Sequence, residues 1–269
     1  MMPTGVIPIS DPADPRIADY RAVRERDLVG RDGLFVAEGQ VVLEKLAAAG
    51  RHPLRSVLVA EKRVAGLAPL LERLGDLPVY SAAQPVMDAI AGFPIHRGLL
   101  AVGERREPPL ADVLAGLPRD GLVVGLVGIA NHDNMGGLFR NAAAFGASAV
   151  LIDADCCDPL YRKAIRVSVG AALTTPFARA GSAHALVDAL AEAGFSVVAL
   201  SPSAQTPLID FQPAPRTALL FGAEGPGLPD AILARCQTVG IAMAGGFDSL
   251  NVATTSGIVL HHLTARGRT

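Results

Sequence analysis

Cysteine is scarce in this chain of 269 residues, and its spacing forms no recognisable pattern. The three cysteines are Cys156, Cys157 and Cys236, which make neither a CxxC pair nor a disulfide framework. None of the six histidines is spaced as a metal site. The sequence therefore predicts neither a disulfide-rich secreted protein nor a metal centre.

Long apolar runs and a large net charge are missing as well. No window approaches the length needed to cross a bilayer, and residues 1–15 lack the basic and apolar regions of a signal peptide. With a net charge of −2, the whole molecule has no general attraction to a polyanion, so nucleic acid would need local basic patches. We expect a cytoplasmic protein whose hydrophobic residues, 50% of the chain, fill one large core or two smaller ones.

The glycine fingerprints of two common nucleotide-binding folds are also absent. Residues 122–129 are continuously apolar, as in a central strand of a parallel sheet, and polar residues follow them. No GxGxxG comes after this strand, and the chain has no Walker phosphate loop. This argues against an enzyme that depends on NAD or another nucleotide.

The chain does contain two blocks in which helical and extended patterns alternate. A charged, proline-bearing break at residues 104–109 separates them, and we place the boundary near residue 112. The first block, residues 1–112, shows no catalytic pattern: Glu38 could be a catalytic acid, but a cap or surface carboxylate is the simpler alternative. The first block is therefore expected to bind or place a substrate, and residues 113–269 to hold the chemistry.

Glycine-rich turns and short polar side chains gather in the second block. Residues 222–227 follow an expected strand and hold four glycine or proline residues in six positions, so their backbone amides could lie against a ligand. Asn134 and Arg140 follow the strand at 122–129, and Ser249 and Asn251 stand where a helix begins. Taken singly, a helix cap for Asn134 and an exposed helix position for Arg140 are the simpler interpretations.

Two basic clusters are candidates for contact with phosphate. Arg162 and Arg166 lie four residues apart, with Lys163 beside them, in a helix expected to begin near Asp158. This is the best local basic patch of the chain, and whether it binds phosphate stays open. Arg21 and Arg24 share a face of another expected helix, residues 17–28, where a solvated face balanced by acidic neighbours is the simpler alternative.

Three segments together resemble the SpoU family of the SPOUT superfamily, which are RNA ribose 2′-O-methyltransferases that use S-adenosylmethionine. They are residues 134–142, 220–228 and 241–252, and their order and spacing agree with the family. Residues 35–39 and 96–102 are similar to the L30e-like substrate-binding domain that many members carry. The resemblance thus extends over most of the chain.

The resemblance implies an α/β fold in two parts. Residues 113–269 would form a SPOUT methyltransferase domain with a deep trefoil knot, and residues 1–112 a smaller L30e-like RNA-binding domain with an N-terminal extension and a linker. General connection rules treat such a knot as exceptional. The resemblance also implies a homodimer, with the cofactor in the knot and the RNA site built across the subunit interface.

The resemblance implies site residues too. The polar positions that match the family's catalytic set are Asn134, Arg140, Glu224, Ser249 and Asn251. The cofactor would be bound, largely through backbone groups, by Gly222, Ala223, Glu224, Gly225, Gly227, Ile241, Met243, Ser249 and Leu250. The candidate RNA contacts are Arg162, Lys163, Arg166, Arg21 and Arg24.

In this reading Arg140 holds the RNA phosphate and the ribose hydroxyl, because a guanidinium is too weak a base to accept the proton. Glu224 would order Arg140 or its own loop, and Ser249 and Asn251 would hold the polar network together. Ala242 and Ala253 depart from the usual pattern, where proline and serine are common. These changes bear on loop rigidity more than on activity.

The resulting prediction is a methyltransferase for ribosomal or transfer RNA; self-protection of ribosomal RNA against an antibiotic is a narrower version. The alternative from another class is a catalytically silent RNA-binding or assembly factor on the same scaffold. All five catalytic positions are intact, which argues against a retired site.

Overall fold

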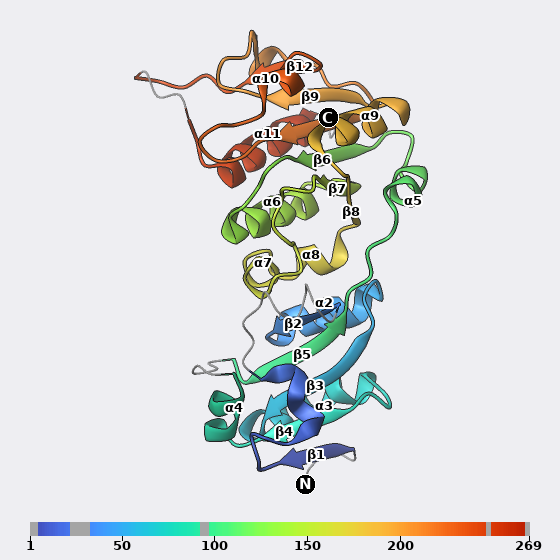
Figure 1. Cartoon of the computed structure of the whole chain (residues 1–269), viewed down its shortest axis with the longest axis vertical. Coiled ribbons are helices and arrows are strands. Elements are labelled where there is room, and N and C mark those ends of the chain that lie inside the picture. The colour runs from blue at the N-terminus through green and yellow to red at the C-terminus, as the bar shows by residue number, and fades with distance from the viewer. Residues whose placement is uncertain (1–4, 22–32, 92–96, 246–248, 267–269) are drawn as a thin grey trace. The chain divides into compact units, whose positions relative to one another are not determined.

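A computed structural model describes residues 5–21, 33–91, 97–245 and 249–266 (Figure 1). The chain forms two compact units. Unit 1 comprises Met1–Arg106 together with Leu160–Thr174, and unit 2 comprises Glu107–Pro159 with Thr175–Thr269. Unit 1 therefore takes in a segment from the middle of the second block, which sequence patterns alone do not reveal.

Unit 1 is built on a five-stranded mixed sheet. In spatial order its strands are β1 (Val6–Ile9), β4 (Val79–Ala82), β3 (Leu54–Ala60), β5 (Leu99–Glu104) and β2 (Leu34–Glu38). β1, β4 and β3 run parallel, whereas β5 pairs antiparallel with both β3 and β2. All five residues of β2 are buried, which fits its continuous apolar stretch.

Helices cover the unit 1 sheet and close its core. They are the 3₁₀ helix η1 (Pro15–Tyr20), α2 (Gln40–Ala49), α3 (Glu61–Arg73) and α4 (Gln84–Ala91). Ile17 and Tyr20 from η1 and Met87 and Ile90 from α4 join one core cluster with strand residues such as Leu58. Tyr20 is fully buried, and its hydroxyl bonds Ser56 Oγ at 2.8 Å, so this phenol is satisfied inside the core.

Two short helices of Leu160–Thr174 pack within unit 1. These are α7 (Arg162–Val167), which contacts β2, and α8 (Ala171–Thr174), which contacts α2. Lys45 Nζ donates to Val169 O at 2.7 Å. Val169 has φ +52°, a conformation that is costly for a β-branched residue, so this turn is held by its surroundings.

Unit 2 is built on a seven-stranded sheet whose pairs are all parallel. In spatial order its strands are β10 (Thr206–Pro207), β12 (Gln237–Gly240), β9 (Ser196–Leu200), β11 (Thr217–Phe221), β6 (Leu122–Leu126), β7 (Ala149–Ile152) and β8 (Phe177–Arg179). Such a sheet is buried on both faces, which explains the apolar runs that predicted its central strands.

The helices of unit 2 lie on both faces of this sheet. Their bounds are α5 (Leu110–Ala115), α6 (His132–Ala144), α9 (Ala183–Glu192), α10 (Asp230–Leu233) and α11 (Val252–Arg266), with a 3₁₀ turn η3 (Leu208–Asp210). One face packs against α5, α9 and α10 in a single cluster. α6 covers the other, where the Phe139 and Phe177 rings meet edge to face at 5.8 Å, and α11 packs against α6 (Figure 1).

Three expected helices differ from the observed ones. The sequence pattern predicts a helix over 138–146 after a polar loop, but α6 begins at His132, since Asn131 caps it and Gly136 and Gly137 lie inside it. The helix expected to begin near Asp158 starts at Arg162, without a side-chain cap. In the expected helix at 17–28, Arg21 is already extended after η1, so helical spacing does not apply to it, and Arg24 lies outside the described residues.

The described residues form neither a membrane-spanning helix nor a cluster of metal-ligating side chains. No helix there is long and apolar enough to cross a membrane. In the same ranges, no group of three or more His, Cys, Asp and Glu side chains is placed to hold a metal ion.

Candidate active site

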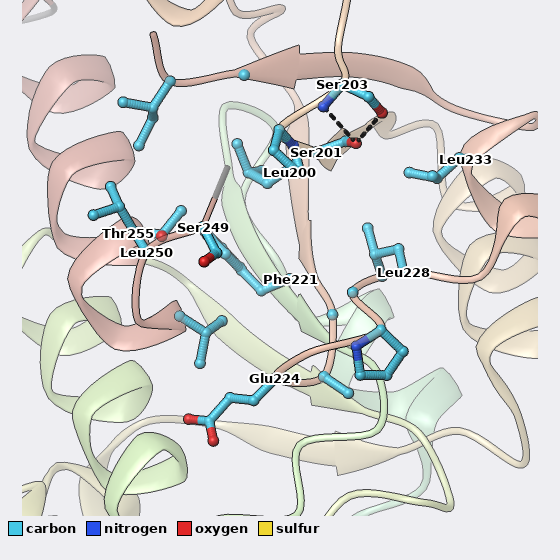
Figure 2. Close-up of a pocket in the computed structure, with 18 of the residues that line it drawn as sticks. Leu200, Ser201, Ser203, Phe221, Glu224, Leu228, Leu233, Ser249, Leu250 and Thr255 are labelled. Atoms are coloured by element: carbon cyan, nitrogen blue, oxygen red, sulfur yellow. Dashed lines mark hydrogen bonds between the residues drawn. The ribbon is translucent and has the colours of Figure 1, made fainter. Parts of the chain in front are cut away.

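A cavity of about 340 Å³ opens in unit 2 at the carboxyl ends of β9, β11 and β12 (Figure 2). Parallel sheets place ligand sites at this edge, because the loops after neighbouring strands meet there. The lining consists of Leu200, Ser201, Pro202, Ser203, Phe221, Gly222, Ala223, Glu224, Gly225, Pro226, Gly227, Leu228, Asp230, Leu233, Val239, Gly240, Ile241, Met243, Ser249, Leu250, Val252 and Thr255. Every residue expected from the resemblance to bind the cofactor lies in this lining.

The turn after β11 forms a tight backbone cradle. Gly227 N donates to Ala223 O at 3.0 Å, and both Gly225 and Gly227 have positive φ, which side chains disfavour. A Cβ added to Gly222 would lie 2.3 Å from both Gly227 C and Leu228 N. Gly222 is thus required by close backbone approach, and Gly225 and Gly227 are favoured by their positive φ, which is the conformational freedom that the sequence predicts for this turn.

Two serines after β9 line the cavity and were missed by sequence reasoning. Ser201 Oγ lies 3.0 Å from Ser203 Oγ and accepts from Ser203 N at 3.3 Å (Figure 2). The backbone here packs closely, since a Cβ on Gly240 would lie 2.8 Å from Ser201 O. Their position directly after an apolar strand could have predicted them, because polar side chains there lie at the carboxyl edge of the sheet, where ligands bind.

Asn134 and Asn251 join the two helices beside the cavity. Asn134 lies in the first turn of α6 and is 6% exposed, and its Oδ1 accepts from Asn251 Nδ2 at 2.8 Å. Asn251 Oδ1 in turn accepts from Ala253 N at 3.0 Å and Thr254 N at 3.1 Å, which caps α11. One carboxamide thus starts α11 and ties it to α6.

Arg140 and Glu224 are both exposed, from α6 and from the turn after β11 respectively. Figure 2 shows the Glu224 carboxylate extending from its turn away from Ser201 and Ser203. No ion pair within the described ranges joins these two side chains. Glu224 therefore does not order Arg140 directly in this structure, although both residues remain available to a ligand.

Ser249 and Leu250 line the cavity just before α11, and both are exposed. Leu250 is 44% exposed, which is a high fraction for a large apolar side chain. Ile241 and Met243 come directly after β12 as irregular backbone, where the sequence pattern predicts a continued strand. The strand ends at Gly240, so these residues are free to form the wall.

The expected RNA contacts on α7 belong to unit 1 and do not act as one exposed face. Arg162 Nη2 lies 3.6 Å from Glu38 Oε2, and both side chains are largely buried, at 12% and 9% exposure. Arg166, one turn later, is exposed. Near η1, Arg21 donates through its guanidinium to Asp14 O. Arg162 and Arg21 are therefore engaged in holding unit 1 together.

The cysteine thiols of the second block are not poised as nucleophiles. Burial raises the pKa of Cys156 to about 12, and nearby Asp153 adds to the effect. Burial likewise raises the pKa of Cys157 to about 12, with Asp158 contributing. Both thiols stay protonated near neutral pH, so covalent catalysis through them is disfavoured.

Comparison with known proteins places the chain in a family. The profile of the SpoU rRNA Methylase family matches residues 121–261. An uncharacterized tRNA/rRNA methyltransferase of Mycobacterium tuberculosis strain H37Rv is 39% identical, over 96% of this chain and 92% of the relative. One from Mycobacterium avium is 31% identical, over 68% of this chain and 60% of the relative.

Solved structures give the same result. The SpoU methyltransferase AviRb from Streptomyces viridochromogenes, in complex with AdoMet, has a TM-score of 0.81 at 26% identity, covering 94% of this chain and 98% of its own. An RNA 2′-O ribose methyltransferase has a TM-score of 0.79 at 28% identity, covering 98% and 99%. An AdoMet-bound rRNA methyltransferase from Sinorhizobium meliloti shares the fold, with a TM-score of 0.84 at 24% identity over 98% and 99%. From the profile, the relatives and the fold together, the chain belongs to the SpoU rRNA methylase family.

Proposed function

We propose that this protein transfers a methyl group from S-adenosylmethionine to a ribose 2′-hydroxyl of structured ribosomal or transfer RNA. Membership of the SpoU family makes it an RNA methyltransferase that uses S-adenosylmethionine. What we propose beyond this is that the methyl group is accepted by a ribose 2′-oxygen. One observation carries it: the Asn134–Asn251 bond fixes α6, with Arg140, to the helix whose first turn lines the cavity.

The residues around the cavity fit the proposed cofactor. Leu200, Leu228 and Leu233 offer apolar surface for a base, and the hydroxyls of Ser201 and Ser203 offer donors and acceptors to a ribose or an amino-acid group. At Gly222 the backbone of Gly227 and Leu228 lies so close that no side chain fits. This turn therefore offers the cofactor backbone amide groups as contacts. When bound, the cofactor supplies a methyl group on a positively charged sulfur.

The protein's own contribution is to place and polarise the acceptor. Arg140 projects from α6 as an exposed guanidinium, which holds a phosphate oxygen and the ribose hydroxyl through paired N–H donors. Its positive charge lowers the pKa of the hydroxyl, and the proton leaves to phosphate or to water, since a guanidinium cannot accept it. Asn134 and Asn251 keep α6 and the cavity wall in register for this step.

Ser249 and Glu224 complete the proposed site from the two loops of the cavity. Ser249 stands directly before the capped start of α11, where its hydroxyl can contact the cofactor or the ribose. Glu224 is exposed in the turn after β11, where its carboxylate can accept a hydrogen bond from Arg140 or from a ribose hydroxyl once RNA is present. Ala223, Gly225, Gly227, Ile241, Met243 and Leu250 supply the remaining cofactor contacts in this proposal.

We further propose the trefoil knot, the homodimer and the L30e-like character of residues 1–112. The strand order supports the knot: β12 is separated from β6 by β9 and β11 in the sheet, yet α11, which follows β12 in the chain, packs on α6. Exposed apolar side chains on and before α11, Ile258 at 40% and Leu250 at 44%, support an interface with a second copy. RNA binding by Lys163 and Arg166, and the cytoplasmic location, stay predictions.

Isothermal titration tests the cofactor part of the proposal. S-adenosylmethionine and its demethylated product should bind the wild-type protein, whereas NAD should not. A Gly222→Ala variant should lose binding, and Gly181→Ala, where an added Cβ has open space, should keep it. If S-adenosylmethionine fails to bind, the silent RNA-binding factor becomes the better account.

Arg140→Lys tests the acceptor part. It keeps the positive charge but removes the planar fork, so turnover should fall by about a hundredfold or more while cofactor binding is unchanged. Turnover close to that of the wild type would refute the bidentate role of Arg140.

A further inference from the structure

Asparagine is rare in this chain, and every copy of it acts in one small region. The four asparagines of the sequence are Asn131, Asn134, Asn141 and Asn251. Asn131 caps α6, Asn251 caps α11, and Asn134 accepts from Asn251. These three bear on the proposed site directly, whereas Asn141 lies two turns further along α6, outside the cavity lining.

Asn141 makes a second connection between α6 and α11. Its Nδ2 donates to Ala253 O at 2.6 Å and to Ser256 Oγ at 2.8 Å, so both of its N–H donors are used. Ser256 is fully buried, and its hydroxyl also donates to Ala253 O at 2.8 Å. The orientation of the amide is fixed by these acceptors, because a flipped Asn141 would set its oxygen against the Ala253 carbonyl.

Glycines on both helices allow α6 and α11 to approach closely near this carboxamide. A Cβ on Gly137 of α6 would lie 2.7 Å from Ala253 Cβ, and one on Gly257 of α11 would lie 3.4 Å from Asn141 Nδ2. Small residues therefore bring the helices together on either side of Asn141. The polar contact fixes the relative register of the helices, which apolar packing alone specifies less strictly.

The two groups that Asn141 binds belong to the first turn of α11, which also lines the cavity. Val252 and Thr255 line the cavity, and Ala253 and Ser256 are the residues next to each of them. Arg140 directly precedes Asn141 on α6. One side chain thus links the helix that carries the proposed RNA-clamping guanidinium to the wall of the proposed cofactor cavity.

We propose that Asn141 is a positioning residue that sets the first turn of α11 against α6, and so couples cofactor binding to the placement of Arg140. This inference rests on the proposed function of the cavity. It assigns Asn141 no contact with cofactor or RNA. Its effect is transmitted through Ala253 O and Ser256 Oγ.

Three variants separate positioning from a general loss of stability. Asn141→Ala removes both bonds, and Asn141→Asp keeps the shape but sets a carboxylate oxygen against the Ala253 carbonyl. Ser256→Ala is milder and leaves the bond to Ala253 O, so it keeps the test valid if the Asn141 variants fail to fold. Thr264→Ala is the matched control, because it deletes one hydroxyl bond to a backbone carbonyl of α11, at Leu260 O, away from the cavity.

The measurements are the Kd for S-adenosylmethionine by calorimetry, the melting temperature, and kcat and KM on RNA. We expect Asn141→Ala and Asn141→Asp to raise the Kd about tenfold and to lower kcat at least as much, with KM for RNA within about twofold of wild type. Ser256→Ala should raise the Kd about threefold, and Thr264→Ala should leave it unchanged even where its melting temperature falls.

A Kd and kcat within about twofold of wild type in Asn141→Ala and Ser256→Ala would overturn the inference, whatever their melting temperatures. Gly222→Ala distinguishes this from failure of the proposed function. If Gly222→Ala weakens cofactor binding and Asn141→Ala does not, only the role of Asn141 is wrong. If neither weakens it, the cavity is not the cofactor site.

Discussion

Asn251 Nδ2 donates to Asn134 Oδ1 at 2.8 Å, and these two residues lie 117 positions apart in the chain. Asn251 uses its other polar atom to cap α11. Its two functions are separable, because a serine at the same position has an oxygen for the cap but no second group that reaches Asn134.

Asn251→Ser should therefore lower the melting temperature only through the lost bond to the buried Asn134 Oδ1, and less than Asn251→Ala, which also removes the cap, while kcat/KM falls at least about tenfold. Asn134→Ala should cost a similar factor, since it removes the same bond from the other side. The double variant should be no worse than either single one. Additive losses in kcat/KM would show that the two residues act independently.

The Gly222 cradle gives a prediction about stability as well as binding. A methyl group at this position meets backbone atoms of Gly227 and Leu228, which cannot rotate away as a flexible side chain would. Gly222→Ala should lower the free energy of unfolding by about 1–3 kcal/mol, through strain in the turn. Urea unfolding measures this, with Gly181→Ala as the control, and an equal effect of both substitutions would count against the cradle.

Much of the second sheet follows from its sequence, and the reason is burial. Strands such as β7 and β11 are buried along their whole length, so their apolar runs give a strong signal. The start of α6 was harder to predict, because Gly136 and Gly137 resemble a loop. Gly137 is inside the helix for a tertiary reason, the contact with Ala253, which no local pattern contains.

The buried pair of Glu38 and Arg162 predicts a division of roles on α7. Glu38→Gln removes the negative charge that faces the largely buried Arg162 guanidinium, which should cost about 1–3 kcal/mol of unfolding free energy. Arg166→Ala, one turn away and exposed, should leave stability unchanged within about 0.5 kcal/mol. Filter binding to ribosomal RNA should show the opposite order, with Arg166→Ala weakening RNA affinity more than Glu38→Gln does.

This pair also shows the limit of sequence reasoning about the basic cluster. Helical spacing correctly puts Arg162 and Arg166 in one helix, but it cannot say which side packs against β2. That side is decided by the return of Leu160–Thr174 to unit 1, a tertiary contact far from its neighbours in sequence. Similarly, Ser201 and Ser203 form no motif and become part of the cavity only because β12 and β11 flank β9.

The cysteines predict a dependence on pH. Burial raises the pKa of Cys156 and Cys157 to about 12 in the folded protein, against an ordinary value near 9. The folded state therefore binds these protons more tightly than the unfolded state does. The resulting stability is fully present below about pH 9 and is lost as the pH rises towards 12.

Iodoacetamide at pH 8 should thus modify both thiols far more slowly in the native protein than in urea. Mass spectrometry of the modified peptides measures the two rates. Rapid native modification of Cys156 would contradict its burial beside Asp153.

Mapping of methylated riboses in cellular RNA tests the proposed methyl transfer to a ribose 2′-hydroxyl. RNA would be compared from four kinds of cell. The first two have or lack the gene for the protein, and the other two lack it but express either the wild-type protein or the Arg140→Ala variant from a plasmid. The account predicts that at least one 2′-O-methyl position in ribosomal or transfer RNA disappears on deletion, returns with the wild type, and stays absent with Arg140→Ala. An unchanged set of 2′-O-methyl positions in all four RNA samples would contradict it.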